Sequence, residues 1–235
     1  MLRYAITDRT RLAANRSGAP FMRGRQDAHG WGESLVAQAA ALAARGDIDF
    51  LQLREKDLPP AALAALARRI LEAIRGSGGP FISRTSRDEW GGAARRPRLL
   101  INSRADVAIA VRADGVHLTS APGELTPAQI RSLCAAAGMP PPIVSLSCHT
   151  LAKVAAARTA NPSLILFGPV FEKRIADQLI TGGLGIELLR RACAAAAPIP
   201  VLALGGITDE NTSACLAAGA SGVAGIRLFK PQGFQ

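Results

Sequence analysis

Three polar side chains at alternating positions follow a short apolar segment of the sequence. Gln52, Arg54 and Lys56 are spaced by two residues and come directly after the run Asp47–Leu51, so they share one face if this segment is a strand. In parallel barrels and sheets, ligands bind at the carboxyl ends of the strands. An amide and two cations at such an end predict a site for an anionic ligand. The alternative is a charged strand end that simply meets water.

A second group of candidate residues lies in the last part of the sequence. Gly205 and Gly206 follow an apolar segment and precede a predicted helix, and Gly225, Ile226 and Arg227 follow the next apolar segment. Adjacent glycines let backbone N–H groups approach an anion closely. In many barrels the loops after the seventh and eighth strands bind a phosphate group. These residues therefore predict a phosphate site, and the alternative is that the glycines serve only tight packing.

Two histidines have different sequence surroundings. His149 ends a predicted strand, and a neutral imidazole can both accept and donate a proton near neutral pH. His149 is therefore a candidate for proton transfer, the alternative being a structural or capping role. His117 lies within an apolar segment and is predicted to be a core histidine with satisfied hydrogen bonds. Asn102 is the last residue of another predicted strand and can form a hydrogen bond with a ligand. Lys173 comes after a further predicted strand and is either an anion contact or an ordinary solvated charge.

Short apolar segments alternate with Ala- and Leu-rich stretches, which is typical of an α/β fold with parallel strands. Strands are expected at Leu2–Thr7, Ile48–Leu53, Arg98–Asn102, Gly115–Leu118, Ile143–Ser147, Leu164–Phe167, Val201–Leu204 and Gly222–Gly225. Helices are expected at Glu33–Arg45, Pro60–Arg75, Ser103–Val111, Pro127–Ala137, Leu151–Ala160, Gly185–Ala197 and Asp209–Ala218. This alternation predicts a single-domain (β/α)8 TIM barrel over residues 1–235. The final helix is expected to be short, because Pro231 and Gly233 come soon after the last strand.

Two segments are long for ordinary loops. Residues 8–32 and 76–97 are rich in Gly and Arg and poor in apolar residues. The first follows the first strand on the expected ligand side, so we interpret it as a lid, the alternative being a mobile surface loop. The second joins a helix to a strand on the opposite side, where a passive insertion is expected.

Composition limits the partners of this chain. Its 28 Lys and Arg against 18 Asp and Glu give a net charge of +10, which favours anionic partners such as phosphorylated metabolites. Basic and aromatic residues do not interleave, so nucleic acid is not expected. No apolar run approaches a membrane span, and the first residues lack a signal-peptide core, so we expect a cytoplasmic protein. The scattered cysteines are expected to be small buried hydrophobes rather than a disulfide framework or zinc site.

Several segments, taken in order, resemble the family of thiamine-phosphate synthase and its TenI-type relatives. The resemblance implies a (β/α)8 barrel that handles a phosphorylated thiazole and often a pyrimidine diphosphate. Its members also suggest a homodimer. The matching segments are Tyr4–Asp8, Gln52–Lys56, Leu100–Asn102, Ala113–Leu118, Ser147–Thr150, Phe167–Phe171 and Gly205–Ile207.

In the synthase branch of this family, Gln52, Arg54, Lys56, Asn102 and Ser147 match positions that contact the pyrimidine and the pyrophosphate. That branch joins the pyrimidine diphosphate to thiazole phosphate, releases pyrophosphate, and uses magnesium held by carboxylates.

The carboxylates that the synthase branch implies are missing at the matching positions. Ser103 stands where one carboxylate should follow Asn102, and the other expected position falls in the run Thr119–Pro122. Glu124 or Asp57 could substitute for them, although neither stands at a matching position. Magnesium usually takes a carboxylate among its hard oxygen ligands, so this chain is expected to bind no metal unless it is a synthase with displaced ligands.

The TenI-type branch matches better, at Leu118–Ser120, Thr126–Arg131 and Leu166–Glu172. Some of its members are thiazole tautomerases that use a histidine at the position of His149 and no metal. The leading hypothesis is therefore a metal-free thiazole phosphate tautomerase with His149 as proton shuttle. The alternatives are a thiamine-phosphate synthase with displaced magnesium ligands and a non-catalytic relative that binds a thiamine precursor.

Overall fold

A computed structural model of the protein describes residues 1–9, 30–76, 96–119, 121–175 and 178–229. Eight parallel strands form a closed barrel in the order β1-β10-β9-β6-β5-β4-β3-β2. Each strand lies close to its predicted range, and the predicted (β/α)8 fold class is confirmed. The strands are β1 (Leu2–Ile6), β2 (Phe50–Leu53), β3 (Arg98–Asn102), β4 (Gly115–Leu118), β5 (Ile143–Cys148), β6 (Leu164–Phe167), β9 (Val201–Leu204) and β10 (Gly222–Gly225).

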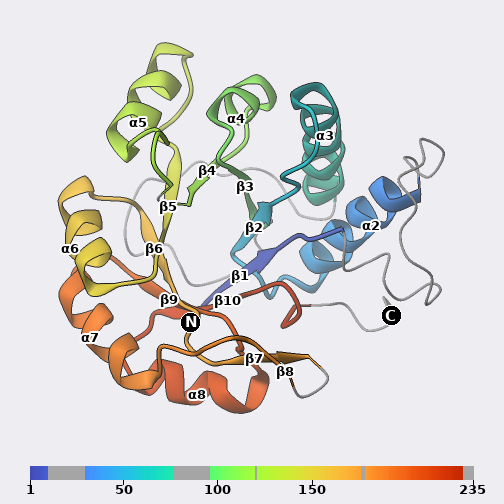
Figure 1. The fold of residues 1–235 in the computed structure, drawn as a ribbon. Helices are drawn as coiled ribbons and strands as arrows, with labels where there is room; N and C mark the ends of the chain where they lie inside the picture. Colours follow the sequence, from blue (N-terminus) through green and yellow to red (C-terminus); the bar gives the residue numbers. More distant parts are fainter. Residues whose placement is uncertain (10–29, 77–95, 120, 176–177, 230–235) are drawn as a thin grey trace.

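The helices that the structure describes surround the barrel in chain order (Figure 1). Thr126 caps α5 with a reciprocal pair of hydrogen bonds to Gln129. The helices are α2 (Gly30–Arg45), α3 (Pro60–Gly76), α4 (Ala105–Val111), α5 (Pro127–Ala136), α6 (Leu151–Ala160), α7 (Ile186–Ala196) and α8 (Asp209–Ala217).

The ring of helices is open between α2 and α8, where the segment after β10 runs (Figure 1). Residues 226–229 form bends and a turn, so the expected short final helix does not begin here. Phe229 is only 2% exposed and joins the apolar core that α2 also contacts. Burying this aromatic side chain directs the segment across the opening. Residues 230–235, and most of the predicted lid (8–32) and insertion (76–97), lie outside the described residues.

A two-stranded antiparallel ribbon follows β6 and was not predicted. It consists of β7 (Lys173–Ile175) and β8 (Gln178–Thr181), and it is separate from the barrel sheet. These strands are short and carry few apolar residues, so the sequence pattern did not distinguish them from a loop. The ribbon follows the carboxyl end of β6, the end at which the predicted ligand site lies.

The interior of the barrel contains a group of polar side chains, here called the polar wall, beside an apolar cluster. Strands β2 to β5 contribute inward-facing polar side chains, and the paired registers place Asn102 opposite His117 and His117 opposite Ser145. The apolar remainder is formed by Tyr4, Ile6, Phe50, Leu100, Leu164, Leu166, Leu202 and Ala224. The polar residues Gln52, Asn102, His117, Ser145 and Ser147 are all buried. The polar wall therefore belongs to four neighbouring strands.

Aliphatic side chains fill the layer between the barrel and its helices. Leu63, Ile70 and Ile74 of α3 are fully or almost fully buried, as expected for an amphipathic helix. Cys134, Cys148 and Cys215 are buried free thiols, which confirms the prediction of small core hydrophobes for these three, whereas Cys193 is a half-buried free thiol. No helix within the described ranges is long and apolar enough to cross a membrane.

Candidate active site at the carboxyl end of the barrel

Gln52 and Asn102 form the centre of the polar wall. Gln52 Nε2 donates a hydrogen bond to Asn102 Oδ1 at 2.8 Å, and the two side chains are 1% and 9% exposed. Within the described part of the chain, Gln52 Oε1 is buried without a hydrogen-bond partner. A buried acceptor without a partner costs free energy. Gln52 is therefore arranged to accept a hydrogen bond from a ligand, which fits its predicted role.

Arg54 and Lys56 give the mouth of the barrel a positive charge. Burial, together with the charges of Arg54 and Lys56, lowers the pKa of His117 to about 3. These two cations therefore act on the polar wall. Arg54 is half-buried and Lys56 is exposed. The structure thus brings together the amide and the two cations that the alternation predicted, at the end where ligands bind in such barrels.

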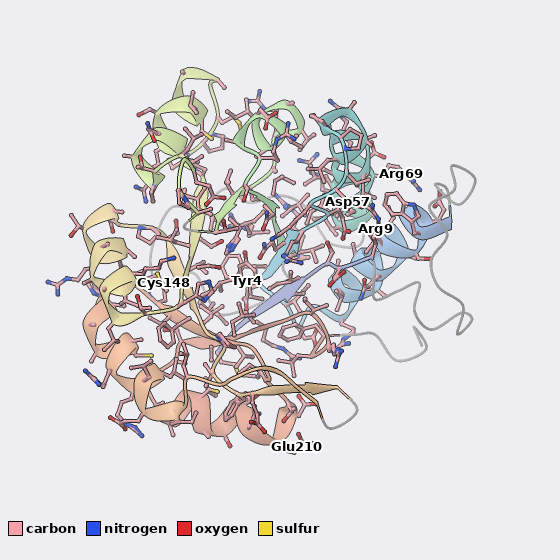
Figure 2. All side chains as sticks on the ribbon, viewed as in Figure 1. Tyr4, Arg9, Asp57, Arg69, Cys148 and Glu210 are labelled. Atoms are coloured by element: carbon pink, nitrogen blue, oxygen red, sulfur yellow. The ribbon has the colours of Figure 1, made fainter. Side chains whose placement is uncertain are left out.

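Glu55 is the residue of this segment that the sequence analysis missed. It lies on the opposite face from Arg54, is 5% exposed, and accepts a hydrogen bond from Thr7 Oγ1 at 2.7 Å. Thr7 Oγ1 also accepts from the Arg54 backbone N–H at 2.9 Å. Burial raises the pKa of the Glu55 carboxyl, and the hydrogen bonds from Thr7 and Arg9 oppose this rise. Arg9 also pairs with Asp57 beside it (Figure 2). This network fastens the end of β1 to the end of β2.

Glu124 reaches the two loops where the sequence lacks the expected carboxylates. Its Oε1 accepts a hydrogen bond from Ser103 Oγ at 2.5 Å, and its Oε2 accepts from the Thr119 backbone N–H at 2.6 Å. Ser103 Oγ in turn accepts from Asn102 Nδ2 at 3.1 Å. Glu124 does not match in sequence, but its carboxylate contacts Ser103 and the backbone of Thr119, the first residue of the second run. The turn at residues 121–124 brings it there, which spacing alone does not reveal.

His117 has the satisfied core environment that its apolar surroundings predicted. The ring is 3% exposed, with Nδ1 at 2.8 Å from Ser145 Oγ and Nε2 at 3.0 Å from Ser147 Oγ. Ser147 is 7% exposed and Ser145 is fully buried. Ser147 therefore belongs to the polar wall together with Gln52 and Asn102.

His149 lies directly after β5 at the rim of the barrel, and its side chain is exposed. Its Nδ1 is 2.5 Å from the Gly168 carbonyl oxygen. A carbonyl oxygen can only accept, so Nδ1 carries the proton. In the neutral ring, Nε2 is then the unprotonated nitrogen. His149 is therefore arranged as a proton acceptor at Nε2, as its candidate role requires.

The Gly205–Gly206 turn requires glycine for backbone reasons. Both residues have positive φ, 92° and 66°. A Cβ at Gly205 would lie 2.6 Å from Pro169, and one at Gly206 would lie 2.6 Å from Phe171. The packing explanation therefore has direct support. Among the described residues, no hydrogen bond engages the N–H groups of these two glycines, so they remain able to bind an anion.

The other predicted phosphate residues follow β10. Gly225 and Ile226 are half-buried at its end, and Arg227 is exposed. The glycine loops after β9 and β10 are neighbours because these strands pair in parallel. The backbone of Lys173 begins β7, but its side chain lies outside the described residues. Its predicted contact with an anion stays a prediction.

Fold and site together define a (β/α)8 barrel with a cationic polar site at the carboxyl ends of its strands. A family model described as thiamine monophosphate synthase matches residues 92–229. A putative thiamine-phosphate synthase of Geobacter sulfurreducens is 37% identical over 193 residues, which cover 82% of this chain and 78% of the relative. The thiamine-phosphate synthase of Methanoregula boonei is 33% identical over 190 residues, covering 81% and 76%.

Among solved structures, thiamine phosphate pyrophosphorylase from Pyrococcus furiosus has a similar fold. Its TM-score is 0.64 at 23% identity, with 96% of this chain and 85% of that chain covered. This chain belongs to the thiamine monophosphate synthase family. The resemblance drawn from the sequence motifs is thereby confirmed.

Proposed function

We propose that this protein is a thiamine-phosphate synthase that joins a pyrimidine diphosphate to thiazole phosphate. The relatives named above support this activity. So does the arrangement of Gln52, Arg54, Lys56, Asn102 and Ser147 at the mouth of the barrel. The observation that carries the proposal is the position of the Glu124 carboxylate between the loops after β3 and β4. This activity was the alternative to the tautomerase hypothesis, and the relatives favour it.

In the proposed reaction, the thiazole nitrogen forms a C–N bond with the methylene carbon of the pyrimidine. The C–O bond to the diphosphate breaks, and pyrophosphate leaves with the bonding electrons. Gln52 would orient the pyrimidine through its unpartnered oxygen. Arg54 and Lys56 would stabilise the charge that develops on the leaving group, which is where preorganised cations contribute most to catalysis. The thiazole phosphate would bind the glycine turns after β9 and β10.

The described residues could bind magnesium only together with oxygen atoms of the substrate. They contain no group of three or more His, Cys, Asp and Glu side chains that could hold a metal. Magnesium is, however, usually bound by one or two carboxylates together with substrate phosphate oxygens. Glu124 would supply the carboxylate and Ser103 a neighbouring hydroxyl. When bound, the ion would neutralise charge on the leaving diphosphate.

Magnesium-dependent turnover of the two substrates tests this function. We expect the wild-type protein to form thiamine phosphate only with magnesium, and Glu124→Gln to lower kcat about 100-fold. The matched control is the double variant Ser103→Asp/Glu124→Gln, which returns a carboxylate to the position next to Asn102 and should recover part of the activity. Absence of product from folded wild-type protein with magnesium would rule out the synthase.

A second function, thiazole phosphate tautomerase, is favoured by the geometry of His149. Its Nδ1 donates to the Gly168 carbonyl, so Nε2 would remove a proton from one atom of the bound thiazole and return it at another. This reaction needs no metal, only one base and an oriented substrate. The phosphate would again bind at Gly205, Gly206, Gly225 and Ile226, with Arg227 as a charge contact.

His149→Ala distinguishes this second function from simple binding. For a tautomerase, the substitution should reduce isomerisation of the carboxythiazole phosphate by on the order of 100-fold or more. Affinity for thiazole phosphate should remain close to that of the wild type. Unchanged isomerisation would remove His149 as the base. The wild-type protein would instead be the non-catalytic relative if it binds thiazole phosphate but shows neither synthase nor tautomerase activity.

A further inference from the structure

Two acidic side chains alternate with the cations at the end of β2. Residues 54–57 read Arg, Glu, Lys and Asp. A carboxylate that turned toward Arg54 or Lys56 would compete with an anionic ligand for their positive charge. The two cations can therefore bind an anion well only if Glu55 and Asp57 are held by other groups.

Arg9 is the group that contacts both carboxylates. Its guanidinium forms an ion pair with Asp57, and its Nη1 lies 3.8 Å from Glu55 Oε2. The Arg9 backbone N–H also donates to the two carboxylate oxygens of Glu55, each at 3.3 Å. Figure 2 shows Arg9 and Asp57 next to each other. One cation from the segment after β1 thus holds both acids of the segment after β2.

Two further elements fix the position of Arg9. Its guanidinium carbon lies 4.5 Å from the centroid of the Trp31 ring in α2, a distance at which a cation and an aromatic ring attract each other. Thr7, which follows β1, donates to Glu55 Oε1 at 2.7 Å and so holds the carboxylate beside Arg9. The Arg9 side chain is only 15% exposed, so solvent and salt screen these contacts less than those of an ordinary surface ion pair.

The cations on the other face of this segment are left without such partners. Across the residues that the structure describes, no ion pair engages Arg54 or Lys56. Both act instead on the polar wall, where their charges add to the effect of burial in lowering the pKa of His117. The contacts of Arg9 therefore separate the charges of residues 54–57 into an acidic face that is paired and a basic face that is not.

We propose that Arg9 is a positioning residue for the anion site, because it holds the carboxylates of Glu55 and Asp57 away from Arg54 and Lys56. The charge of those two cations then acts on a ligand rather than on the neighbouring acids. The identity of that ligand, a diphosphate group, rests on the proposed function. The role of Arg9 does not, because it follows from the protein's own contacts.

Binding of inorganic pyrophosphate, measured by calorimetry without magnesium, tests this role. Arg9→Met removes the charge and keeps an unbranched side chain beside Trp31. We expect it to weaken pyrophosphate binding about threefold to tenfold, because the released carboxylates compete for the cations. The triple variant Arg9→Met/Glu55→Gln/Asp57→Asn also removes the two acids and should bind within about twofold of the wild type. A purely structural role of Arg9 predicts no such recovery.

Arg69→Met is the matched control. It also removes one positive charge from an ion pair, that of Arg69 with Glu33, and should leave affinity for pyrophosphate close to that of the wild type. Equal affinities of the wild type and Arg9→Met, an equal loss in Arg69→Met, or a loss that persists in the triple variant would overturn the proposal. Trp31→Leu provides a second test if Arg9→Met does not fold, and it should weaken binding in the same direction but by less.

The carboxyl of Glu55 gives a measurement without any ligand. Arg9 lowers the pKa of this carboxyl, against the rise that burial and the charge of Asp8 cause. In ¹³C-glutamate-labelled protein, Arg9→Met should therefore raise the pKa of Glu55, and Glu55→Gln assigns its signal. An unchanged pKa would contradict the contact on which the proposal depends. Neither this measurement nor pyrophosphate binding involves turnover, so absence of thiamine phosphate formation would count against the synthase activity alone.

Discussion

At the scale of single residues, His117 of the polar wall should make the free energy of unfolding depend on pH. Its pKa in the folded protein is about 3, whereas an unfolded chain has a histidine pKa of about 6.5. Between these values the unfolded state binds one more proton at this residue than the folded state does. The free energy of unfolding should therefore fall as pH falls below about 6.5, by up to about 1.4 kcal/mol per pH unit from this residue.

This acid dependence is measured by urea unfolding of wild type and His117→Gln at pH 7, 6, 5 and 4. The variant retains hydrogen-bonding groups but cannot titrate, and other acids contribute equally to both curves. We expect the wild type to lose stability relative to the variant at each step down. The groups that act on His117, namely Arg54, Lys56, Ser145 and Ser147, are present in both proteins. Parallel curves would contradict the prediction, because they would mean that His117 binds its proton equally well in the folded and unfolded states.

Residue types and spacing predicted some of the site residues. The others are recognised only from their hydrogen bonds in the folded structure. Alternation at the end of β2 identified Gln52, Arg54 and Lys56, because period-two spacing fixes which side chains share a face. Glu124 could not be identified in this way, because its carboxylate reaches Ser103 only through the path of a loop. The hydrogen bonds that run from Tyr4 through Ser145 and His117 to Ser147 join strands that are distant in sequence but close in the barrel. Such contacts depend on closure of the barrel.

At the scale of elements, the period of the apolar pattern predicted the barrel strands and helices, while local backbone geometry set their ends. Helix α4 begins at Ala105 rather than at the expected Ser103, because Ser103 has a φ of 56°, which lies outside the right-handed helical region. The β7–β8 ribbon was missed because its short strands carry few apolar residues. Elements that bury a broad apolar face are therefore those that the sequence identifies best.

The turn after β9 gives a prediction at this scale. Gly206→Ala places a Cβ at a φ of 66° and 2.6 Å from Phe171 Cβ. We expect a loss of about 1–3 kcal/mol in the free energy of unfolding, from left-handed strain and the overlap together. Urea unfolding measures this loss. Gly182→Ala is the matched control, because a Cβ there meets nothing within 4 Å. Equal stabilities of the two variants would mean that the turn relaxes and that packing does not require Gly206.

At the scale of the whole molecule, closure of the barrel depends on β1, which pairs with both β10 and β2. The outer side of this junction lies at the opening in the ring of helices (Figure 1). Phe229 covers it in place of a helix, and the Arg3 guanidinium lies 5.1 Å from the centroid of the Phe229 ring. The same segment follows Gly225 and Ile226. Packing at the opening therefore also positions half of the proposed phosphate site.

Phe229→Ala should accordingly destabilise the whole barrel rather than only its last segment. Removing a buried phenylalanine side chain costs about 3–5 kcal/mol, and here the lost contacts lie at the junction that closes the sheet. We expect one cooperative urea transition at a lower midpoint, together with weaker binding of thiazole phosphate at subdenaturing urea. Leu133→Ala is the control, since Leu133 is 43% exposed and should change stability little. A variant with unaltered midpoint would show that β1 and its pairing partners close the barrel without cover at this opening.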